Sequence, residues 1–323
     1  MVSSKRITFS GATICPPSTQ NVAKRVMPVI RPAGMSEKFK YHNWFANTPS
    51  PSVTSASRAS SSPPARSSDV GTSWPVFTGG PFRGWALLAD IDDNGTDDII
   101  ITSGDGKLYA LDYQGYDLPG FPYKLGSASE SSPTAADIDN DGMLEIVVGD
   151  NSGFVHAVNH DGTPLGGWEM PKSTGYSVKS SPALGDIDGD GFLEIVVGSE
   201  DFKVYAWKPN GLLMSGWPVP TEYNIFHSSP AIADVDGDSE VEVVIASGDG
   251  RVYALEANGR SVPGFPLVQP AVEGTTGSAT IHGSVTLADM GSGLAAVVGA
   301  EDGKLYAWRV SDGTPMVASF ARM

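Results

Sequence analysis

The sequence contains a single cysteine, Cys15, so no disulfide can form within the chain and cysteine usage does not indicate a redox compartment. It has no apolar run near the roughly 18 residues that a transmembrane helix needs. The 3.6-residue apolar period of an amphipathic helix is also missing, which excludes helical and α/β folds. Phosphate-binding glycine loops, a HExxH zinc motif and a serine or cysteine nucleophile signature are absent, so we predict no catalytic residues.

Positive charge is scarce outside the first part of the chain. Residues 1–70 hold nine Lys and Arg against two Asp and Glu, whereas residues 71–323 hold twelve against thirty-five, and the formal net charge is −16. So acidic a body disfavours nucleic acid and anionic membranes as partners, and it suits cations or basic surfaces.

Residues 1–70 are rich in Ser, Pro and Arg, most clearly over 48–68. Such a segment buries too little apolar surface to offset its ordering entropy, so we predict a disordered basic tail or linker. Its apolar cluster at 26–30 is short and contains a proline, so this cluster cannot serve as the apolar region of a secretory signal. An organellar transit peptide is the alternative interpretation.

What the chain does contain is a repeat. The stretch 180–207 reads SSPALGDIDGDGFLEIVVGSEDFKVYAW, and similar stretches occur five times. Their acidic loops start at Asp90, Asp137, Asp186, Asp234 and Asp289, so the steps are 47, 49, 48 and 55 residues. A period of this length indicates an array of one supersecondary unit. The units span about 79–125, 126–172, 173–220, 221–268 and 269–323.

Each unit carries the signals of four antiparallel strands. A short small-residue strand leads into the acidic loop, and a β-branched run such as 195–197 follows it. A Gly-rich turn precedes a third strand such as 204–207, and a Gly-aromatic-Pro phrase such as 216–218 marks a fourth, outer strand. Four-stranded sheets repeated without helices predict an all-β fold, a β-propeller, rather than a β-solenoid, whose rungs are shorter.

The phrase Ser73-Trp74-Pro75-Val76 matches the outer-strand phrase before the first unit begins. We therefore hypothesise that residues 72–78 complete the last sheet and latch a five-bladed ring. The alternative is part of a larger ring whose other blades are missing.

Four loops share one spacing of oxygen ligands. Positions 1, 3, 5 and 9 carry carboxylates or an amide, and position 7 can offer a backbone carbonyl, a set that suits a hard cation such as Ca²⁺. The predicted metal-binding residues are Asp90, Asp92, Asn94, Thr96 and Asp98; Asp137, Asp139, Asp141, Met143 and Glu145; Asp186, Asp188, Asp190, Phe192 and Glu194; and Asp234, Asp236, Asp238, Glu240 and Glu242. The EF-hand is excluded because position 12 is apolar and strands flank the loop. The fifth loop, from Asp289, has lost its carboxylates, and we predict no cation there.

These acidic loops and the Ile/Val-Val-Gly strands after them resemble the FG-GAP repeat of integrin alpha-subunit propellers and of related bacterial and fungal proteins, over about residues 72–310. The resemblance implies about four structural Ca²⁺ sites, each between the first two strands of a blade, and rings that commonly have seven blades. A shorter similarity, at 106–112, is to quinoprotein-type propellers.

One position differs in charge from unit to unit. The residues seven before each loop are Arg83, Glu130, Lys179, His227 and His282. Because the units share a scaffold, we expect these side chains to face one end of the central channel and to form a ligand site. Tyr176, Tyr223 and Phe226 in the preceding loops could stack on a sugar.

The sequence therefore predicts a calcium-stabilised binding or adhesion module for a glycan or protein ligand. We expect it outside the cell or at the cell surface, where millimolar calcium fills sites of roughly 10⁻⁴–10⁻³ M affinity, and it could be part of a larger protein. The alternatives are a polysaccharide lyase or hydrolase, a quinoprotein-like dehydrogenase, or a scaffold for protein assembly.

Overall fold

Every regular element of the structure, a computed structural model, is a β-strand. The model describes residues 74–269, 279–291 and 293–316, and the predicted tail of residues 1–70 lies outside these ranges. Within them, no helix has the length and apolar character needed to cross a membrane.

In the described residues, nineteen strands form five antiparallel sheets, which we call blades 1 to 5, and within each blade every strand pairs with the next one along the chain. Blade 1 contains β1 (Leu87–Ala89), β2 (Asp98–Ser103), β3 (Lys107–Leu111) and β4 (Tyr123–Lys124). Blade 2 contains β5 (Thr134–Ala136), β6 (Glu145–Gly149), β7 (Phe154–Val158) and β8 (Lys172–Ser173). Blade 3 contains β9 (Ala183–Gly185), β10 (Glu194–Ser199), β11 (Lys203–Trp207) and β12 (Val219–Pro220). Blade 4 contains β13 (Ala231–Ala233), β14 (Glu242–Ala246), β15 (Arg251–Leu255) and β16 (Leu267–Val268). Blade 5 contains β17 (Thr286–Asp289), β18 (Leu294–Gly299) and β19 (Leu305–Arg309).

The second strand of blades 2, 3 and 4 is buried on both faces, as its unbroken apolar run predicts. All six residues of β10 are buried, and the strand pairs with β9 on one side and β11 on the other. A strand covered on both faces has no solvent side, so it needs no alternation of polar and apolar residues. The propeller sheets predicted from the sequence are thus confirmed, although none of them closes on itself.

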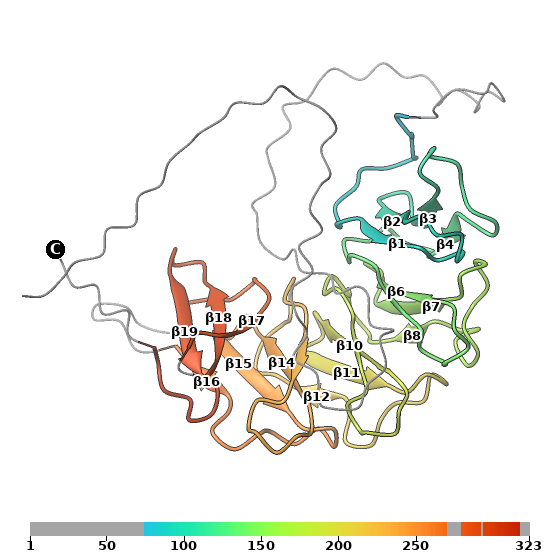
Figure 1. Cartoon of the computed structure of the whole chain (residues 1–323). Coiled ribbons are helices and arrows are strands. Elements are labelled where there is room, and N and C mark those ends of the chain that lie inside the picture. Colours follow the sequence, from blue (N-terminus) through green and yellow to red (C-terminus); the bar gives the residue numbers. More distant parts are fainter. Residues whose placement is uncertain (1–73, 270–278, 292, 317–323) are drawn as a thin grey trace, which may run out of the picture. The chain divides into compact units, whose positions relative to one another are not determined.

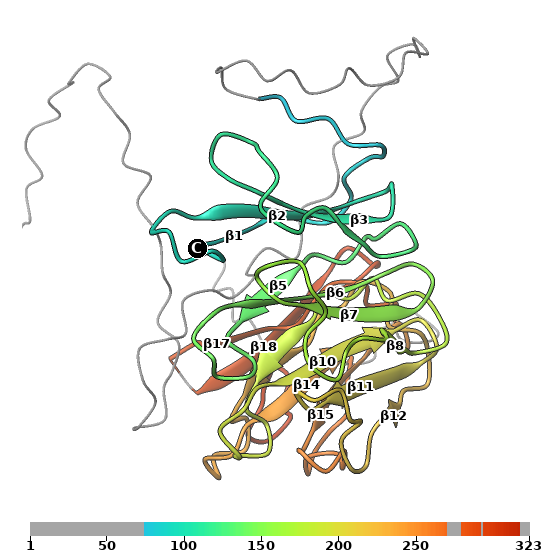
Figure 2. The same cartoon turned by 90° about the vertical axis from the view of Figure 1, so that its right-hand side faces the viewer.

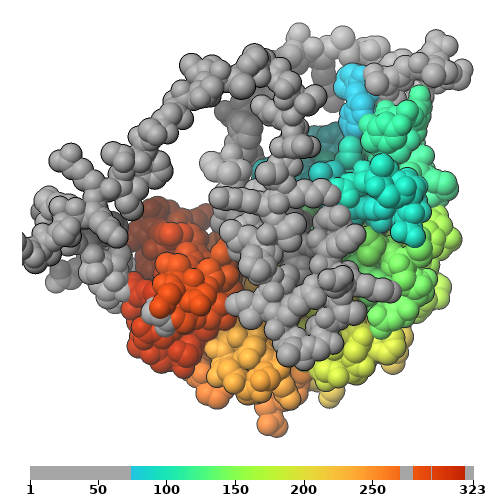
Figure 3. Space-filling view, viewed as in Figure 1, coloured from blue at the N-terminus to red at the C-terminus, as the bar shows by residue number. Residues whose placement is uncertain are grey.

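The hydrophobic core is divided into four clusters, and each cluster lies between two consecutive blades. Trp168 of blade 2 meets Trp207 of blade 3 edge to face, with ring centroids 5.9 Å apart. The first strands of consecutive blades are also in contact, from β1 to β17 in chain order. The blades follow one another in chain order (Figures 1 and 2). In the space-filling view the colours accordingly pass from one blade directly to the next (Figure 3).

The tyrosines of the third strands share one hydrogen-bonding pattern. Tyr205 is buried, and its single hydroxyl proton is shared between two acceptors, Asp201 Oδ2 at 2.6 Å and the Thr174 carbonyl at 2.7 Å. The same tyrosine-to-aspartate bond recurs in blades 1, 4 and 5. In blade 2 His156 replaces the tyrosine, and its Nε2 lies 3.2 Å from Asp150 Oδ2.

The Gly-aromatic-Pro sequence lies before the outer strand, and not within it as the sequence had suggested. It forms the turn that leads into the outer strand, and the strand itself is the short segment that follows, such as β12. The aromatic residue is held by the next blade, since Trp217 Nε1 donates a 2.8 Å hydrogen bond to the Ala257 carbonyl of blade 4. Trp168 makes the equivalent bond to the Pro209 carbonyl of blade 3.

Trp74 repeats this contact at the start of the described chain. Its Nε1 donates a 3.0 Å hydrogen bond to the Tyr113 carbonyl of blade 1, so it is placed on blade 1 as Trp217 is placed on blade 4. The predicted latch is not formed, because no described residue pairs with β19 as a fourth strand. Residues 74–80 instead lie against blade 1, where Gly79 N also bonds to Asp105 Oδ2.

The antiparallel order separates the predicted sites into two groups. The acidic loops join the first strand of a blade to the second, such as β9 to β10. The turn after the second strand and the loop before the first strand lie at the opposite end. Each blade therefore has a cation-loop end and an opposite end, where the predicted ligand residues lie.

Candidate metal centres and ligand-binding end

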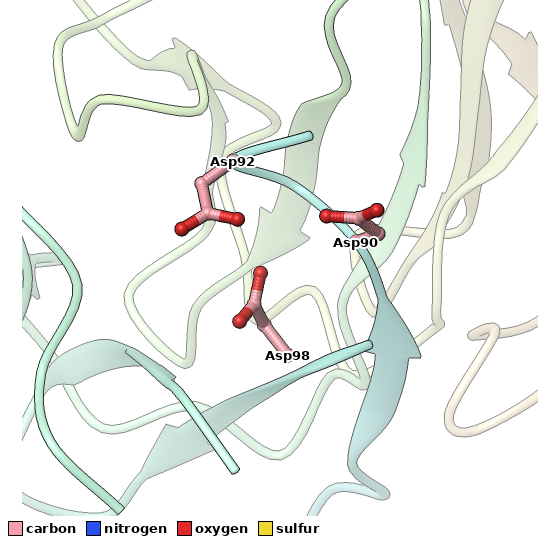
Figure 4. A group of neighbouring side chains, drawn as sticks. All are labelled: Asp90, Asp92 and Asp98. Carbon is pink, nitrogen blue, oxygen red and sulfur yellow. The ribbon is translucent and has the colours of Figure 1, made fainter. Parts of the chain in front are cut away.

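Four acidic loops bring three carboxylates together at one point each. In every group the candidate ligand oxygens lie within 4.8 Å of one another. In the first loop the carboxylates of Asp90, Asp92 and Asp98 turn toward one another (Figure 4). The four groups come from positions 1, 3 and 9 and are Asp90, Asp92 and Asp98; Asp137, Asp139 and Glu145; Asp186, Asp188 and Glu194; and Asp234, Asp236 and Glu242.

The position-9 carboxylate is the buried base of each loop. One of its oxygens accepts a hydrogen bond from the backbone N–H of the residue after position 1, which is 2.8 Å long from Ile187 to Glu194 Oε2. Equivalent bonds of 3.1, 2.7 and 2.7 Å close the loops at Asp98, Glu145 and Glu242. This bond fixes the loop across seven residues and directs the second oxygen into the carboxylate group.

That second oxygen shows that the loops fit a cation. Asp98 Oδ1, Glu194 Oε1 and Glu242 Oε1 are buried and have no hydrogen-bond partner among the described residues. A buried carboxylate oxygen without a partner carries a large desolvation cost. A divalent cation with oxygen-only ligands would satisfy it.

The electrostatics of the position-9 groups indicate the same need for positive charge. Burial, together with the neighbouring charges of Asp188 and Asp190, raises the pKa of Glu194 to about 7. Burial and like charges raise the pKa of Glu145 and Glu242 to about 7 and that of Asp98 to about 6. These groups resist ionisation unless a positive charge balances them.

Position 5 is engaged in the turn. Asp190 Oδ1 accepts a 3.0 Å hydrogen bond from the N–H of Phe192, and Asp141 and Asp238 bond to Met143 and Glu240 in the same way. In the first loop Asn94 bonds to Thr96. These bonds shape the loop but leave untested the prediction that position 5 and the carbonyl of position 7 bind the ion.

The fifth loop is built differently. Asp289 Oδ1 accepts a 2.8 Å hydrogen bond from Gly291 N, and Ser292 lies outside the described residues. The absence of a cation there stays a prediction.

The third loop has an additional charged partner that the sequence did not reveal. Lys208 Nζ lies 2.6 Å from Asp188 Oδ2 and 2.7 Å from Asp190 Oδ2. The hydrogen bond from the Lys208 ammonium lowers the pKa of Asp190. Lys208 follows the third strand of its blade, so only the pairing of β11 with β10 brings it to the loop.

At the opposite end, the predicted ligand residues of blades 3 to 5 form one cluster around Phe226. Lys179 Nζ lies 4.1 Å from the centre of the Phe226 ring, and the rings of His227 and His282 lie 4.3 and 5.2 Å from it. Lys179 also pairs with Glu200 at 3.1 Å, and His282 Nδ1 pairs with Glu301 at 3.2 Å.

The pKa of His227 reflects the charges of this cluster. His227 keeps part of its surface in solvent, but surrounding protein atoms displace much of the water near its ring. This desolvation lowers the pKa of His227. The charges of Lys179 and His282 lower the pKa further, whereas Glu130 and Glu200 act in the other direction. Glu130 is thus near the cluster, and it contacts Asn151 at 3.5 Å. Arg83 is exposed on blade 1, and no contact in the described structure joins it to the others.

Beside this cluster an open cavity of about 470 Å³ lies between blades 3 and 4. Two of the three predicted stacking residues, Tyr176 and Tyr223, line it and are 65% and 51% exposed, whereas Phe226 is not among its lining residues. Phe202 stacks on Tyr223, with centroids 5.6 Å apart and planes 10° apart. Glu200, Asp201 and Asn224 complete the wall.

Phe202 and Glu200 were not among the residues predicted from the sequence. A signal does exist, because the turn after the second strand reads Ser-Gly-Asp-Gly at 103–106 and 247–250 but Ser-Glu-Asp-Phe at 199–202. Phe202 adopts a φ of 70°, close to the 80° and 79° of the equivalent Gly106 and Gly250. A bulky residue in this left-handed region costs about 1–2 kcal/mol, and such strain tends to occur at functional sites.

Comparison with known proteins agrees with this geometry. A model of the FG-GAP-like repeat matches three overlapping segments, residues 90–148, 137–197 and 186–245. No curated protein matches the sequence.

Solved structures with low sequence identity are also similar to this chain. BamB from Moraxella catarrhalis has a TM-score of 0.51 and 19% identity, over 74% of this chain and 61% of that one. The WD40 β-propeller domain of Doa1 has a TM-score of 0.47 and 16% identity, over 74% and 68%. The chain thus spans less than two thirds of BamB. From the matched repeats and the stacked four-stranded blades, we conclude that the chain is an FG-GAP β-propeller repeat protein.

Proposed function

We propose that this propeller is a calcium-stabilised binding module that recognises a neutral glycan at the end opposite its cation loops. The observation that carries the proposal is the cavity in which Tyr176, Phe202 and Tyr223 gather beside polar groups. The two halves of the proposal, cation and ligand, have separate structural support.

Calcium is supported by the donor set. The three grouped carboxylates of each loop supply only oxygen atoms, which favour hard cations over zinc or copper. Asp186, Asp188 and Glu194, and their counterparts in the other three loops, would hold the ion. The ion would supply positive charge that balances buried carboxylates, and it would keep the loop between the first two strands in shape.

A sugar is supported by the composition of the cavity. Exposed aromatic rings offer flat apolar faces for the C–H groups of a pyranose, while Glu200, Asp201 and Asn224 can accept or donate hydrogen bonds to hydroxyls. Lys179 is already paired with Glu200, so the site has no free positive charge from this lysine for an acidic sugar. A neutral glycan fits these groups better than an acidic one.

The strained backbone of Phe202 adds a second argument. Glycine would fit its turn without cost, as it does in blades 1 and 4. A phenylalanine retained at a positive φ and stacked on Tyr223 is explained if the aromatic ring contacts a ligand.

We further propose that the module acts outside the cell or at the cell surface, in adhesion or capture of glycans. The cation loops support this setting, because extracellular calcium-binding modules have weak sites that millimolar calcium fills.

The test is binding to neutral and acidic oligosaccharides by a glycan array and calorimetry, in calcium. We expect neutral glycans to bind, and Tyr176→Ala and Tyr223→Ala to weaken binding at least about tenfold. Tyr113→Ala is the matched control, since Tyr113 is 66% exposed but lies at the cation-loop end of blade 1. Binding that survives both cavity variants, or no glycan binding at all, would contradict the proposal.

A further inference from the structure

The residue at the end of the third strand, near the cation loop, differs in charge from blade to blade. This residue, which ends the third strand or directly follows it, occupies an equivalent place in every blade. In each blade its backbone N–H donates a hydrogen bond to the carbonyl across the next turn. These bonds run from Asp112 to Tyr116, Asn159 to Thr163, Lys208 to Leu212, Glu256 to Arg260 and Arg309 to Thr314, at 2.7 to 2.9 Å. The backbone is the same, but the charge changes from blade to blade.

In blade 3 this residue is Lys208, whose ammonium bridges Asp188 and Asp190. Asp188 belongs to the carboxylate group that would hold the ion. The lysine side chain is 34% exposed and that of Asp188 is 25% exposed, so the pair is partly shielded from water. A partly shielded ion pair is stronger than one on the open surface.

In blade 4 the residue is Glu256, with the opposite charge. Strand register places it beside the fourth loop, since Leu255 is paired with Val243 as Trp207 is paired with Ile195 in blade 3, so Glu256 adds to the negative potential of that loop. In blade 1, Asp112 instead accepts hydrogen bonds from the N–H groups of Gln114 and Tyr116 in its own turn. In blade 2 the equivalent Asn159 is uncharged and bonds to Thr163.

We propose that Lys208 is a built-in counter-ion of the third loop, which competes with calcium there and makes this the weakest of the four cation sites. Glu256 has the opposite effect and makes the fourth loop one of the tighter sites. The loops therefore fill in order as calcium rises, and the third loop keeps its shape at low calcium because an ammonium already bridges two of its carboxylates.

This inference rests on the proposed cation binding by the loops, and ion counting separates the two. In native mass spectrometry and calorimetry with calcium as the probe, the wild-type protein is expected to bind three ions before the fourth. Lys208→Gln is expected to raise the affinity of the last ion about tenfold, the effect of about 1.4 kcal/mol of removed repulsion. Glu256→Gln is expected to weaken one of the earlier ions.

Two variants assign the effect to the third loop. Lys208→Gln combined with Asp188→Asn is expected to lose the gained affinity. Lys203→Gln is the matched control, because Lys203 pairs with Asp201 at the opposite end of the same blade and should leave all four affinities unchanged.

A second measurement does not depend on calcium. In excess chelator, Lys208→Gln is expected to lower the melting temperature, because the third loop loses its counter-charge, whereas in saturating calcium it should not. Unchanged affinities and unchanged melting in Lys208→Gln would overturn the inference while calcium binding itself stands. If neither the wild type nor any variant binds calcium, the cation assignment fails, and this inference fails with it.

Discussion

Glu194 accepts a hydrogen bond of 2.8 Å from the backbone N–H of Ile187, while its other carboxylate oxygen is buried without a hydrogen-bond partner in the described structure. One half of the side chain thus closes the loop, and the other half is available to a cation. This division of roles accounts for both the shape of the loop and its dependence on positive charge.

Glu194→Gln tests this division. The amide oxygen of glutamine can still accept the Ile187 hydrogen bond, but the side chain no longer supplies a negative charge. In calcium we expect the variant to lose about 1–3 kcal/mol of unfolding free energy, since a ligand of the ion is weakened. In chelator we expect it to be as stable as the wild type or more stable, because like-charge repulsion is relieved. Urea unfolding in both conditions measures this, and destabilisation of equal size in the two would contradict it.

The pH dependence of stability should reverse with calcium. Burial raises the pKa of Glu145, Glu194 and Glu242 to about 7 from an ordinary value of 4.5. Without calcium the folded state therefore binds more protons than the unfolded state between these values, so stability falls as pH rises from about 4.5 to 7. With calcium the ionised form is the binding form, and stability should rise over the same window. Urea unfolding at several pH values, with calcium and with chelator, gives the two slopes, and equal slopes would refute the assignment.

Phe202→Gly separates stability from binding. Glycine relieves the strain of a φ of 70°, which offsets the lost stacking on Tyr223, so we expect the unfolding free energy to change by no more than about 1 kcal/mol. Glycan affinity should fall at least about tenfold. The control Phe202→Tyr keeps the ring and should keep both properties. Glycan binding of wild-type strength in Phe202→Gly would show that the ring does not contact the ligand.

Tyr205→Phe tests the repeated contact between tyrosine and aspartate. The variant removes a buried hydroxyl that bonds to Asp201 and to the Thr174 carbonyl, and it should destabilise the fold by about 1–3 kcal/mol. Tyr113→Phe, at an exposed tyrosine, should change stability by less than about 0.5 kcal/mol. Thermal unfolding of the two variants side by side decides whether the contact stabilises the blade.

The repeat made most of the fold predictable from the sequence. Runs such as Ile195-Val196-Val197 identified the buried strands, and the fixed spacing of Asp186, Asp188 and Glu194 identified groups of carboxylates that do converge. Both signals are local, so the repeated copies in one chain reinforced one another.

Contacts between segments far apart in the chain were the part that the sequence could not supply. The position of Trp74 against the Tyr113 carbonyl, rather than in a closed last sheet, depends on how blades stack. The pairing of Lys179 with Glu200, and of Lys208 with Asp188, joins residues 21 and 20 positions apart through strand pairing. Predicting such pairs requires the register of neighbouring strands, which periodicity alone does not give.

The most direct test of the central claim is the thermal unfolding of the full chain with calcium and with excess chelator, together with a count of bound ions by atomic emission. We predict a clear fall in melting temperature on chelation and about four calcium ions per chain in saturating calcium. Identical melting curves, with no ion bound, would contradict the account.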